Sequence, residues 1–298
     1  MHVVIAGASG FLGRHLRTEL QARGHTVTAL VRRPARGADE AQWDPYTGVL
    51  DPALVDAADV VVNLAGSPTA GNPHSARWAR ELRESRITST RVLAEAIAAV
   101  GNPPAYLAGN GISYYGDHGG APLTEASDSR GQALLTQVTR EWQAATTAAS
   151  EAGARVCVLR TAPVMDRDAA PLKLLLPLFR AGLGARLGSG RQHMAMISLR
   201  DWVGAVAFLA EHESVSGPVN LTCPQPPTNA EFTRALARAV HRPAVLPVPS
   251  PLLRVGAGAM APELLGSLNV RSAVLEAAGF EFRDPDVDAV LAAGLHRG

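Results

Sequence analysis

The most informative part of the sequence is a glycine-rich stretch near its start, Gly7-Ala8-Ser9-Gly10-Phe11-Leu12-Gly13. It directly follows the apolar run His2–Ala6 and opens a segment with helical periodicity. In such a strand–turn–helix unit, Gly7 allows a sharp turn, Gly10 lets a phosphate approach the backbone, and Gly13 lets the helix pack closely on the strand. The N–H groups and the dipole at the start of a helix attract anions. An ordinary turn is the alternative, but the complete context favours a dinucleotide-binding turn. The expected cofactor contacts are Gly7, Ser9, Gly10, Phe11, Leu12 and Gly13.

Two arginines follow the second apolar run, Thr26–Val31, and bear on the choice of dinucleotide. NAD enzymes tend to carry Asp or Glu at this place, where the carboxylate binds the ribose 2′-hydroxyl. Arg32 and Arg33 stand here instead. A guanidinium can hold a 2′-phosphate through charge-assisted hydrogen bonds, and the missing carboxylate removes a repulsion. We therefore expect NADP(H), with solvated loop charges as the alternative.

The third apolar run, Val60–Leu64, is followed by the small residues Ala65 and Gly66. Leu64, Ala65 and Gly66 would let the adenine-ribose side of the cofactor lie against the backbone at the carboxyl ends of the strands. A plain strand terminator is the alternative. The position in the same crevice favours cofactor binding.

The first half of the chain alternates short apolar runs with long helical patterns, which is typical of a parallel sheet covered by helices on both faces. We expect strands over His2–Ala6, Thr26–Val31, Val60–Leu64, Ala105–Ala108 and Ala154–Leu159. Helices are expected over Phe11–Arg23, Ser75–Val100 and Gln132–Glu151. The predicted fold class is α/β, with a Rossmann-type doubly wound parallel sheet and a smaller inserted and C-terminal substrate lobe.

The pattern changes after Arg160, where prolines become frequent. Pro171–Leu187 is expected to form a helix, Val203–Glu211 another, and Val219–Leu221 a strand that returns to the sheet. We therefore expect an NADP-binding domain over residues 1–165, to which residues 200–222 return. Residues 166–199 and 223–298 are expected to form the substrate lobe.

Composition excludes several classes of partner. The chain has 298 residues, with 28 basic and 27 acidic residues and a formal charge of +1, so nucleic acid and membrane surfaces are not expected to bind. The two cysteines, Cys157 and Cys223, lack any metal-ligand spacing. Neither a disulfide nor a metal site is therefore expected, and Cys157 is expected to lie in the core. No basic segment precedes an apolar stretch at the start, and no apolar run is long enough to span a membrane, so we expect a soluble cytoplasmic protein.

Several specific stretches are spread along nearly the whole chain. They include Trp43-Asp44-Pro45, Asn63–Gly66, Tyr114-Tyr115-Gly116-Asp117, Gly217–Thr222, Thr228–Phe232, Glu263-Leu264-Leu265 and Ala278–Phe282. With these stretches, the sequence resembles the extended short-chain dehydrogenase/reductases of the NAD-dependent epimerase/dehydratase superfamily, and among them the atypical epimerase-like subfamily that includes bacterial YfcH. The end of the chain resembles the small C-terminal domain of that subfamily, whose role is not established.

The resemblance implies a Ser–Tyr–Lys catalytic set that this chain does not retain. The serine position falls at or near Asn110 and Gly111, the tyrosine position at Leu135, and the lysine position at Thr139. Leucine cannot exchange a proton, and threonine carries no charge to lower the pKa of a phenol. Ordinary carbonyl reduction by this set is therefore not expected.

Other residues are candidates for the missing roles. Tyr114 and Tyr115 follow the fourth strand, where the crevice should open, and either could donate a proton, although packing is the alternative for both. Asn110, Arg191 and His193 are candidates for substrate binding, with a structural role as the alternative for His193.

Three functions remain open on this reasoning. The leading one is an NADP(H)-binding oxidoreductase or epimerase-like enzyme that acts on an unidentified small molecule, as a monomer or homodimer. A nucleotide-binding sensor or scaffold without hydride chemistry is the second. A non-redox isomerase or cyclase on the same fold is the third.

Overall fold

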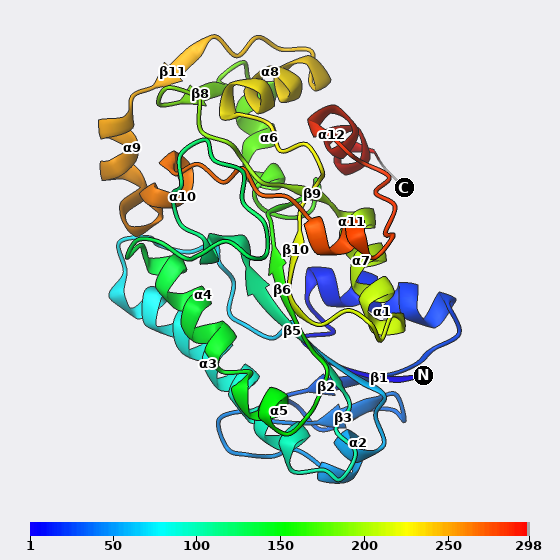
Figure 1. Cartoon of the computed structure of the whole chain (residues 1–298). Coiled ribbons are helices and arrows are strands. Elements are labelled where there is room, and N and C mark those ends of the chain that lie inside the picture. Colours follow the sequence, from blue (N-terminus) through cyan, green and yellow to red (C-terminus); the bar gives the residue numbers. More distant parts are fainter. Residues whose placement is uncertain (297–298) are drawn as a thin grey trace.

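The structure is a computed structural model that describes residues 1–296. Its centre is a seven-stranded sheet in which all neighbouring strands are parallel (Figure 1). The chain builds the sheet outward from β1 in one direction and from β4 in the other, so a topological switch point lies between β1 and β4. Open α/β sheets bind ligands at such a point, outside the carboxyl ends of the strands. From edge to edge, the strands are β10 (Gly217–Leu221), β6 (Val156–Thr161), β5 (Ala105–Gly111), β4 (Val60–Asn63), β1 (His2–Ala6), β2 (Thr26–Val31) and β3 (Glu40–Gln42).

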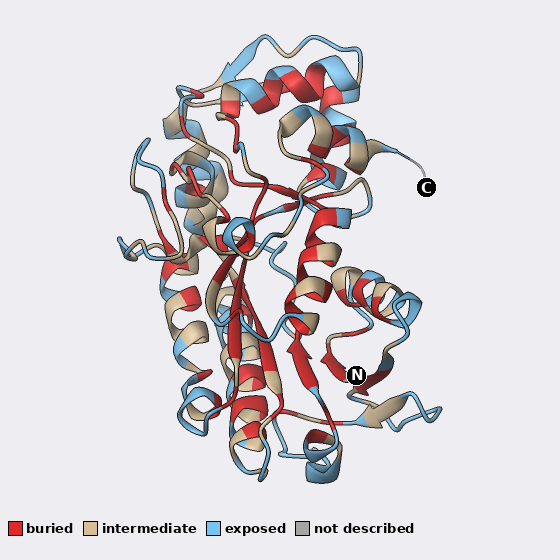
Figure 2. Cartoon of the chain, turned by 45° about the vertical axis from the view of Figure 1, so that its right-hand side comes forward, coloured by how far each residue is buried: buried red, intermediate tan, exposed pale blue. Residues whose placement is uncertain are grey.

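Helices cover both faces of this sheet, which explains why the inner strands are apolar on both sides. On one face, Leu16 and Leu20 of the first helix pack with Val3 and Ile5. On the other face, Leu93 packs in a separate core with Val4 and Val61. Figure 2 shows the strands as an almost continuous buried layer between the helices. The helices of the first face are α1 (Phe11–Ala22) and α7 (Leu199–Glu211), and those of the second are α2 (Pro52–Asp56), α3 (Ala76–Ala98), α4 (Leu134–Ala144) and α5 (Thr147–Glu151).

A smaller group of elements lies beyond the carboxyl ends of the strands (Figure 1). Its core joins two separate parts of the chain, because Leu176 and Phe179 pack with Phe232 and Leu236. The elements of this group are α6 (Leu172–Arg180), β8 (Ala185–Leu187), α8 (Asn229–Ala239), β11 (Leu246–Val248), α9 (Ser250–Ala257), η2 (Gly258–Met260), α10 (Ala261–Leu265) and α12 (Val287–Leu295). Short connecting elements complete the fold: η1 (Ile112–Tyr114), β7 (Val164–Met165), β9 (Ile197–Ser198) and α11 (Ala273–Ala277).

The structure confirms the predicted fold class and the five strands expected in the first half. The predicted strand over Val219–Leu221 is part of β10, which pairs with β6. The short strand β3 was not predicted, because Glu40–Gln42 is polar and only half-buried at the sheet edge.

Two helix predictions need correction. The helix expected over Pro171–Leu187 ends at Arg180, because Gly182 takes a φ of 76° and the chain then enters β8. The helix expected over Gln132–Glu151 is two helices, α4 and α5. At the break between them, the Thr146 hydroxyl donates to the carbonyl of Gln143 at 2.8 Å, a local bond that competes with helix continuation.

Two further sequence-based expectations can be compared with the described residues. Cys157 is buried in the core as predicted, and Cys223 is a second buried free thiol. Within residues 1–296, no helix combines the length and apolar character that crossing a membrane requires.

Candidate functional site

The glycine-rich turn joins β1 to α1 at the carboxyl edge of the sheet. Gly7 has a φ of 81°, and a Cβ added to it would lie 2.6 Å from the carbonyl carbon of Leu64. A Cβ on Gly13 would lie 2.7 Å from the Cα of Ala8. Both positions lack space for a side chain. Gly7 and Gly13 therefore allow the turn to lie against the end of β4 and beneath α1.

Gly10 has a more open environment than the other two glycines. It is exposed, and a Cβ on it would meet only the Gly7 carbonyl oxygen, at 3.2 Å. Gly10 is also the N-cap of α1, where no side chain accepts a hydrogen bond and no acidic residue occupies the first turn. The first N–H groups of α1 thus lack a side-chain acceptor within the cap. This arrangement fits the pyrophosphate of a dinucleotide.

The two arginines after β2 differ in their partners. Arg33 donates to both carboxylate oxygens of Glu40, at 2.7 and 2.6 Å. This contact holds the pKa of Glu40 at about 2. Arg32 is exposed and forms no ion pair with any of residues 1–296. Arg32 is therefore available to a ligand, whereas the charge of Arg33 is already compensated.

The segment after β4 lies beside the glycine turn, as the approach of Gly7 to Leu64 shows. Asn63 fixes its course, because the Asn63 Oδ1 accepts from the backbone N of Ala65 at 3.0 Å. The Asn63 Nδ2 in turn donates to Thr90 of α3 at 2.9 Å. Leu64, Ala65 and Gly66 are thereby held at the switch point of the sheet.

Arg86 of α3 lies against this segment and was not singled out by the sequence. A Cβ on Gly66 would lie 3.2 Å from the Cγ of Arg86. The Arg86 guanidinium donates to the Thr69 hydroxyl and to the Leu82 carbonyl, at 3.0 Å each. It pairs with no carboxylate in the described part of the chain, and burial lowers its pKa to about 10. A half-buried cation without a counter-charge fits an anionic group of a ligand.

The residues at the positions of the family's catalytic set are packed together but carry no acid. Asn110 is 4% exposed, and its Nδ2 donates to the carbonyl of Thr139 at 3.1 Å. Its Oδ1 accepts from the backbone N of Gly111 at 2.7 Å. The polar atoms of Asn110 therefore connect β5 to α4, which leaves little capacity for the substrate contact expected of it.

Tyr115 lies inside the protein. Its side chain is fully buried, and its hydroxyl donates to the Asn220 Oδ1 at 2.7 Å and accepts from the Arg160 Nη1 at 2.8 Å. Burial raises the pKa of the Tyr115 phenol. A group that is buried and bonded on both sides cannot reach a ligand while the core is closed. This placement argues against Tyr115 as the expected proton donor.

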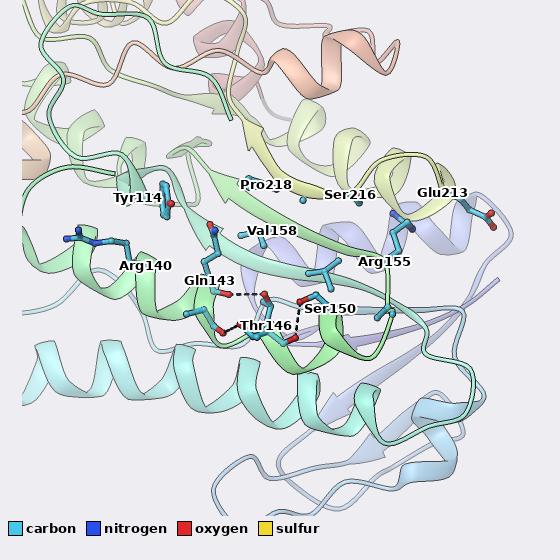
Figure 3. A pocket seen from close by; sticks show the side chains of 16 residues that line it. Tyr114, Arg140, Gln143, Thr146, Ser150, Arg155, Val158, Glu213, Ser216 and Pro218 are labelled. Carbon is cyan, nitrogen blue, oxygen red and sulfur yellow. Dashed lines mark hydrogen bonds between the residues drawn. The ribbon is translucent and has the colours of Figure 1, made fainter. Parts of the chain in front are cut away.

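Tyr114 lines a groove between the helices α4 and α5 and the strands β6 and β10 (Figure 3). Its ring stacks on the guanidinium of Arg160, whose Cζ lies 3.6 Å from the ring centroid. The groove has a volume of about 730 Å³ and extends to Ala154 and Val156, at the amino end of β6. It therefore lies along the face of the sheet and not in the crevice at the glycine turn. Among residues 1–296, the side-chain hydrogen bond and ring contacts that Tyr114 makes are to Ser129, Tyr115 and Arg160, none of which belongs to the predicted cofactor-binding segments.

The predicted substrate residues Arg191 and His193 lie on the loop after β8. Arg191 is exposed, and the backbone N of His193 donates to the Ser267 hydroxyl at 3.0 Å. Between them, the Gln192 Nε2 donates to the carbonyl of Leu264 at 3.1 Å. These bonds attach the loop to α10.

A carboxyl group that sequence reasoning missed lies at the junction of the two parts of the molecule. Glu263 of α10 accepts a hydrogen bond from the hydroxyl of Ser113 in η1 at 2.6 Å. Burial raises the pKa of the Glu263 carboxyl, and the Ser113 bond opposes this only partly. Because η1 follows β5 directly, this contact lies at the carboxyl edge of the sheet. No local motif could have shown it, since the two residues are 150 positions apart.

The parallel sheet with its β1–turn–α1 unit defines a Rossmann-type dinucleotide-binding protein. Residues 3–221 match the NAD dependent epimerase/dehydratase family, and residues 248–293 match a domain of unknown function, DUF1731. The chain therefore belongs to the NAD dependent epimerase/dehydratase family, as the resemblance of its motifs implied.

Similar proteins cover almost the whole chain. Epimerase family protein Mb2239 of Mycobacterium bovis is 43% identical over 97% of this chain and 96% of its own length. The crystal structure of human epimerase family protein SDR39U1 (isoform 2) with NADPH is 30% identical, with a TM-score of 0.88 over 99% of both chains. A structure of the nucleoside-diphosphate sugar epimerase from Corynebacterium glutamicum is 32% identical, with a TM-score of 0.81 over 99% of this chain and 58% of that one.

Proposed function

We propose that the protein is an NADP(H)-dependent oxidoreductase or epimerase-like enzyme that acts on a small molecule at the carboxyl edge of the sheet. Two features at this edge carry the proposal. The start of α1 at Gly10 has no side-chain cap and suits a pyrophosphate, and Arg32 after β2, which forms no ion pair within residues 1–296, suits a 2′-phosphate.

The proposed cofactor contacts come from three segments that meet at the switch point. Residues 7–13 would hold the pyrophosphate, and Leu64–Gly66 would lie beneath the ribose. Arg86, beside Gly66, would offer its charge to a phosphate of the cofactor or to an anionic substrate. Bound there, the nicotinamide would supply or accept a hydride. The human relative that was crystallised with NADPH supports this choice of nucleotide.

The proposed substrate site lies between two regions of the chain. Residues 1–165 and 200–222 would form the cofactor domain, while 166–199 and 223–298 would form the substrate lobe. The loop that carries Arg191 and His193 would face the substrate, held by its bonds to α10.

Two measurements on the purified protein test this proposal. Calorimetric titration should show that NADPH binds more tightly than NADH. Absorbance of NADPH should then fall in the presence of at least one member of a panel of aldehydes, ketones and keto-sugar nucleotides. Binding without any consumption would favour a nucleotide sensor or scaffold, which the loss of an acid at Leu135 also favours. Failure to bind either nucleotide would refute the proposal.

A further inference from the structure

One carboxyl group at the carboxyl edge of the sheet comes from the C-terminal region that matches DUF1731. Glu263 lies within residues 248–293, yet its hydrogen-bond partner is Ser113, in the segment that follows β5. Ser113 stands just beyond Gly111, where the family would place its serine. The Ser113–Glu263 contact therefore brings an acid from the C-terminal region to the end of a central strand.

Other contacts hold α10 in this position. The backbone N of Ser267 donates to the Asp117 Oδ1 at 3.2 Å, which connects the end of α10 to the segment after η1. The carbonyl of Leu264 accepts from Gln192 of the substrate-lobe loop at 3.1 Å. Glu263 is thus placed where the cofactor domain, the lobe loop and the C-terminal region meet.

Glu263 lacks the counter-charge that a structural carboxylate at a buried position would need. It forms no ion pair within residues 1–296, and Ser113 is its hydrogen-bond partner. The neighbouring segments carry other titratable groups, namely Asp117, His118 and His193 on loops and Arg254 on α9, and none of them pairs with Glu263. Burial without a counter-charge favours the protonated form of a carboxyl group. A carboxyl group with a raised pKa at the carboxyl edge of the sheet is suited to proton transfer.

We infer that Glu263 is the proton donor and acceptor of the crevice, and that the C-terminal region supplies it in place of the tyrosine that Leu135 replaces. This inference rests on the function proposed above. During reduction, the Glu263 carboxyl gives its proton to the carbonyl oxygen, and the carboxylate then regains a proton from water. Bound NADPH would supply the hydride for the carbonyl carbon and become NADP⁺, so the product would be an alcohol. In the reverse direction, the carboxylate accepts the proton of the hydroxyl. Ser113 is a positioning residue, because its hydroxyl orients the carboxyl group.

Proton release on nucleotide binding tests this inference without a known substrate. Oxidised nicotinamide carries a positive charge and reduced nicotinamide does not, so a carboxyl group beside it should lose its proton more readily when NADP⁺ is bound. The whole chain is titrated with NADP⁺ and with NADPH in buffers of different ionisation enthalpy, from about pH 5 to 8. We expect more protons to be released with NADP⁺. This difference should be lost in Glu263→Gln, which keeps the shape of the side chain.

Two further variants separate a specific effect from a general one. Glu276→Gln removes an exposed carboxylate from α11 in the same region and should leave the proton difference unchanged. Ser113→Ala removes a hydrogen bond that favours the carboxylate form of Glu263. The pH at which proton release differs between NADP⁺ and NADPH binding should therefore rise. For a carbonyl compound that the wild type reduces, Glu263→Gln should lower kcat by roughly 10²-fold or more.

These outcomes distinguish the inference about Glu263 from the proposed function. If the wild type binds both nucleotides and Glu263→Gln keeps the proton difference, the inference about Glu263 is wrong while the proposed function stands. If the wild type binds neither nucleotide, the proposed function itself fails. Loss of the difference in Glu263→Gln alone, with its pH shift in Ser113→Ala, supports the inference.

Discussion

A single buried cation explains where the two tyrosines after β5 lie. Arg160 is 2% exposed and forms no ion pair among the described residues, but its guanidinium bonds to Tyr115 and to the Gln143 side chain and stacks on the rings of Tyr114 and Tyr115. A buried charge is tolerated when hydrogen bonds compensate its loss of hydration. The sequence placed both tyrosines correctly after the fourth strand of the predicted set. It could not show that Arg160 of the next strand would bond to the Tyr115 hydroxyl and stack on both rings.

Replacing Tyr115 should affect stability more than binding. Tyr115→Phe leaves the Arg160 Nη1 and the Asn220 Oδ1 each without one buried partner, so the free energy of unfolding should fall by about 1–3 kcal/mol. Urea denaturation measures this loss, and NADPH titration should show unchanged affinity. Tyr114→Phe is the matched control and should change stability less, because the Tyr114 hydroxyl forms no hydrogen bond with any of residues 1–296. A stable Tyr115→Phe variant that loses turnover would restore Tyr115 as the proton donor.

The preference for NADPH should depend on Arg32. Arg32→Ala should weaken NADPH binding by roughly 10-fold or more, the size expected of one charge-assisted hydrogen bond, and leave NADH binding nearly unchanged. Arg77→Ala provides the control, since it removes the same charge from a side chain that is 81% exposed on α3. Calorimetry with both nucleotides measures the effect. Equal affinities for NADPH and NADH in the wild type would remove the assigned role of Arg32.

At the scale of elements, the strand–turn–helix unit at the start of the chain was predictable because its constraints are local. The bounds of β1 are those expected, and α1 ends within one residue of the expected position. Elements whose form depends on distant partners were less predictable. β8 forms only by pairing with β11, some sixty residues later in the chain, so Ala185–Leu187 was taken for the end of a helix.

Two glycines of the turn, Gly10 and Gly13, should respond differently to the same substitution. Gly10→Val should abolish NADPH binding and keep the fold, because its Cβ meets only one backbone oxygen at 3.2 Å and otherwise points into the expected phosphate site. Gly13→Val should instead destabilise the protein, since its Cβ would overlap the backbone at Ala8. Circular dichroism and NADPH titration separate the two effects. Normal NADPH binding by Gly10→Val would show that the turn has been misassigned.

The groove along α4 and α5 (Figure 3) is lined by none of residues 7–13 and 64–66, so it is separate from the cofactor site expected at the carboxyl ends of the strands. The sequence predicted that cofactor site from the order of strands and helices. It could not predict that Glu263 of the C-terminal region would reach Ser113, or that Arg86 of α3 would lie against Gly66, because no periodicity or motif relates the residues of either pair. Such contacts are set by the packing of complete elements.

Filling the groove should therefore leave the nucleotide site intact. Ser150 is exposed on α5 and lines the groove, so Ser150→Trp would block it far from the glycine turn. We expect unchanged NADPH affinity by calorimetry and an unchanged melting temperature within the usual range for surface substitutions. A large loss of NADPH affinity would show that the groove belongs to the nucleotide site.

A crystal structure of the protein with NADPH would test the proposed nucleotide site most directly. We expect the pyrophosphate to contact the backbone N–H groups at the start of α1 and the 2′-phosphate to contact Arg32. The nicotinamide should lie between Gly66 and the Ser113–Glu263 pair. A nucleotide bound in the groove beside Tyr114, or one whose 2′-phosphate lies away from Arg32, would contradict the proposed site.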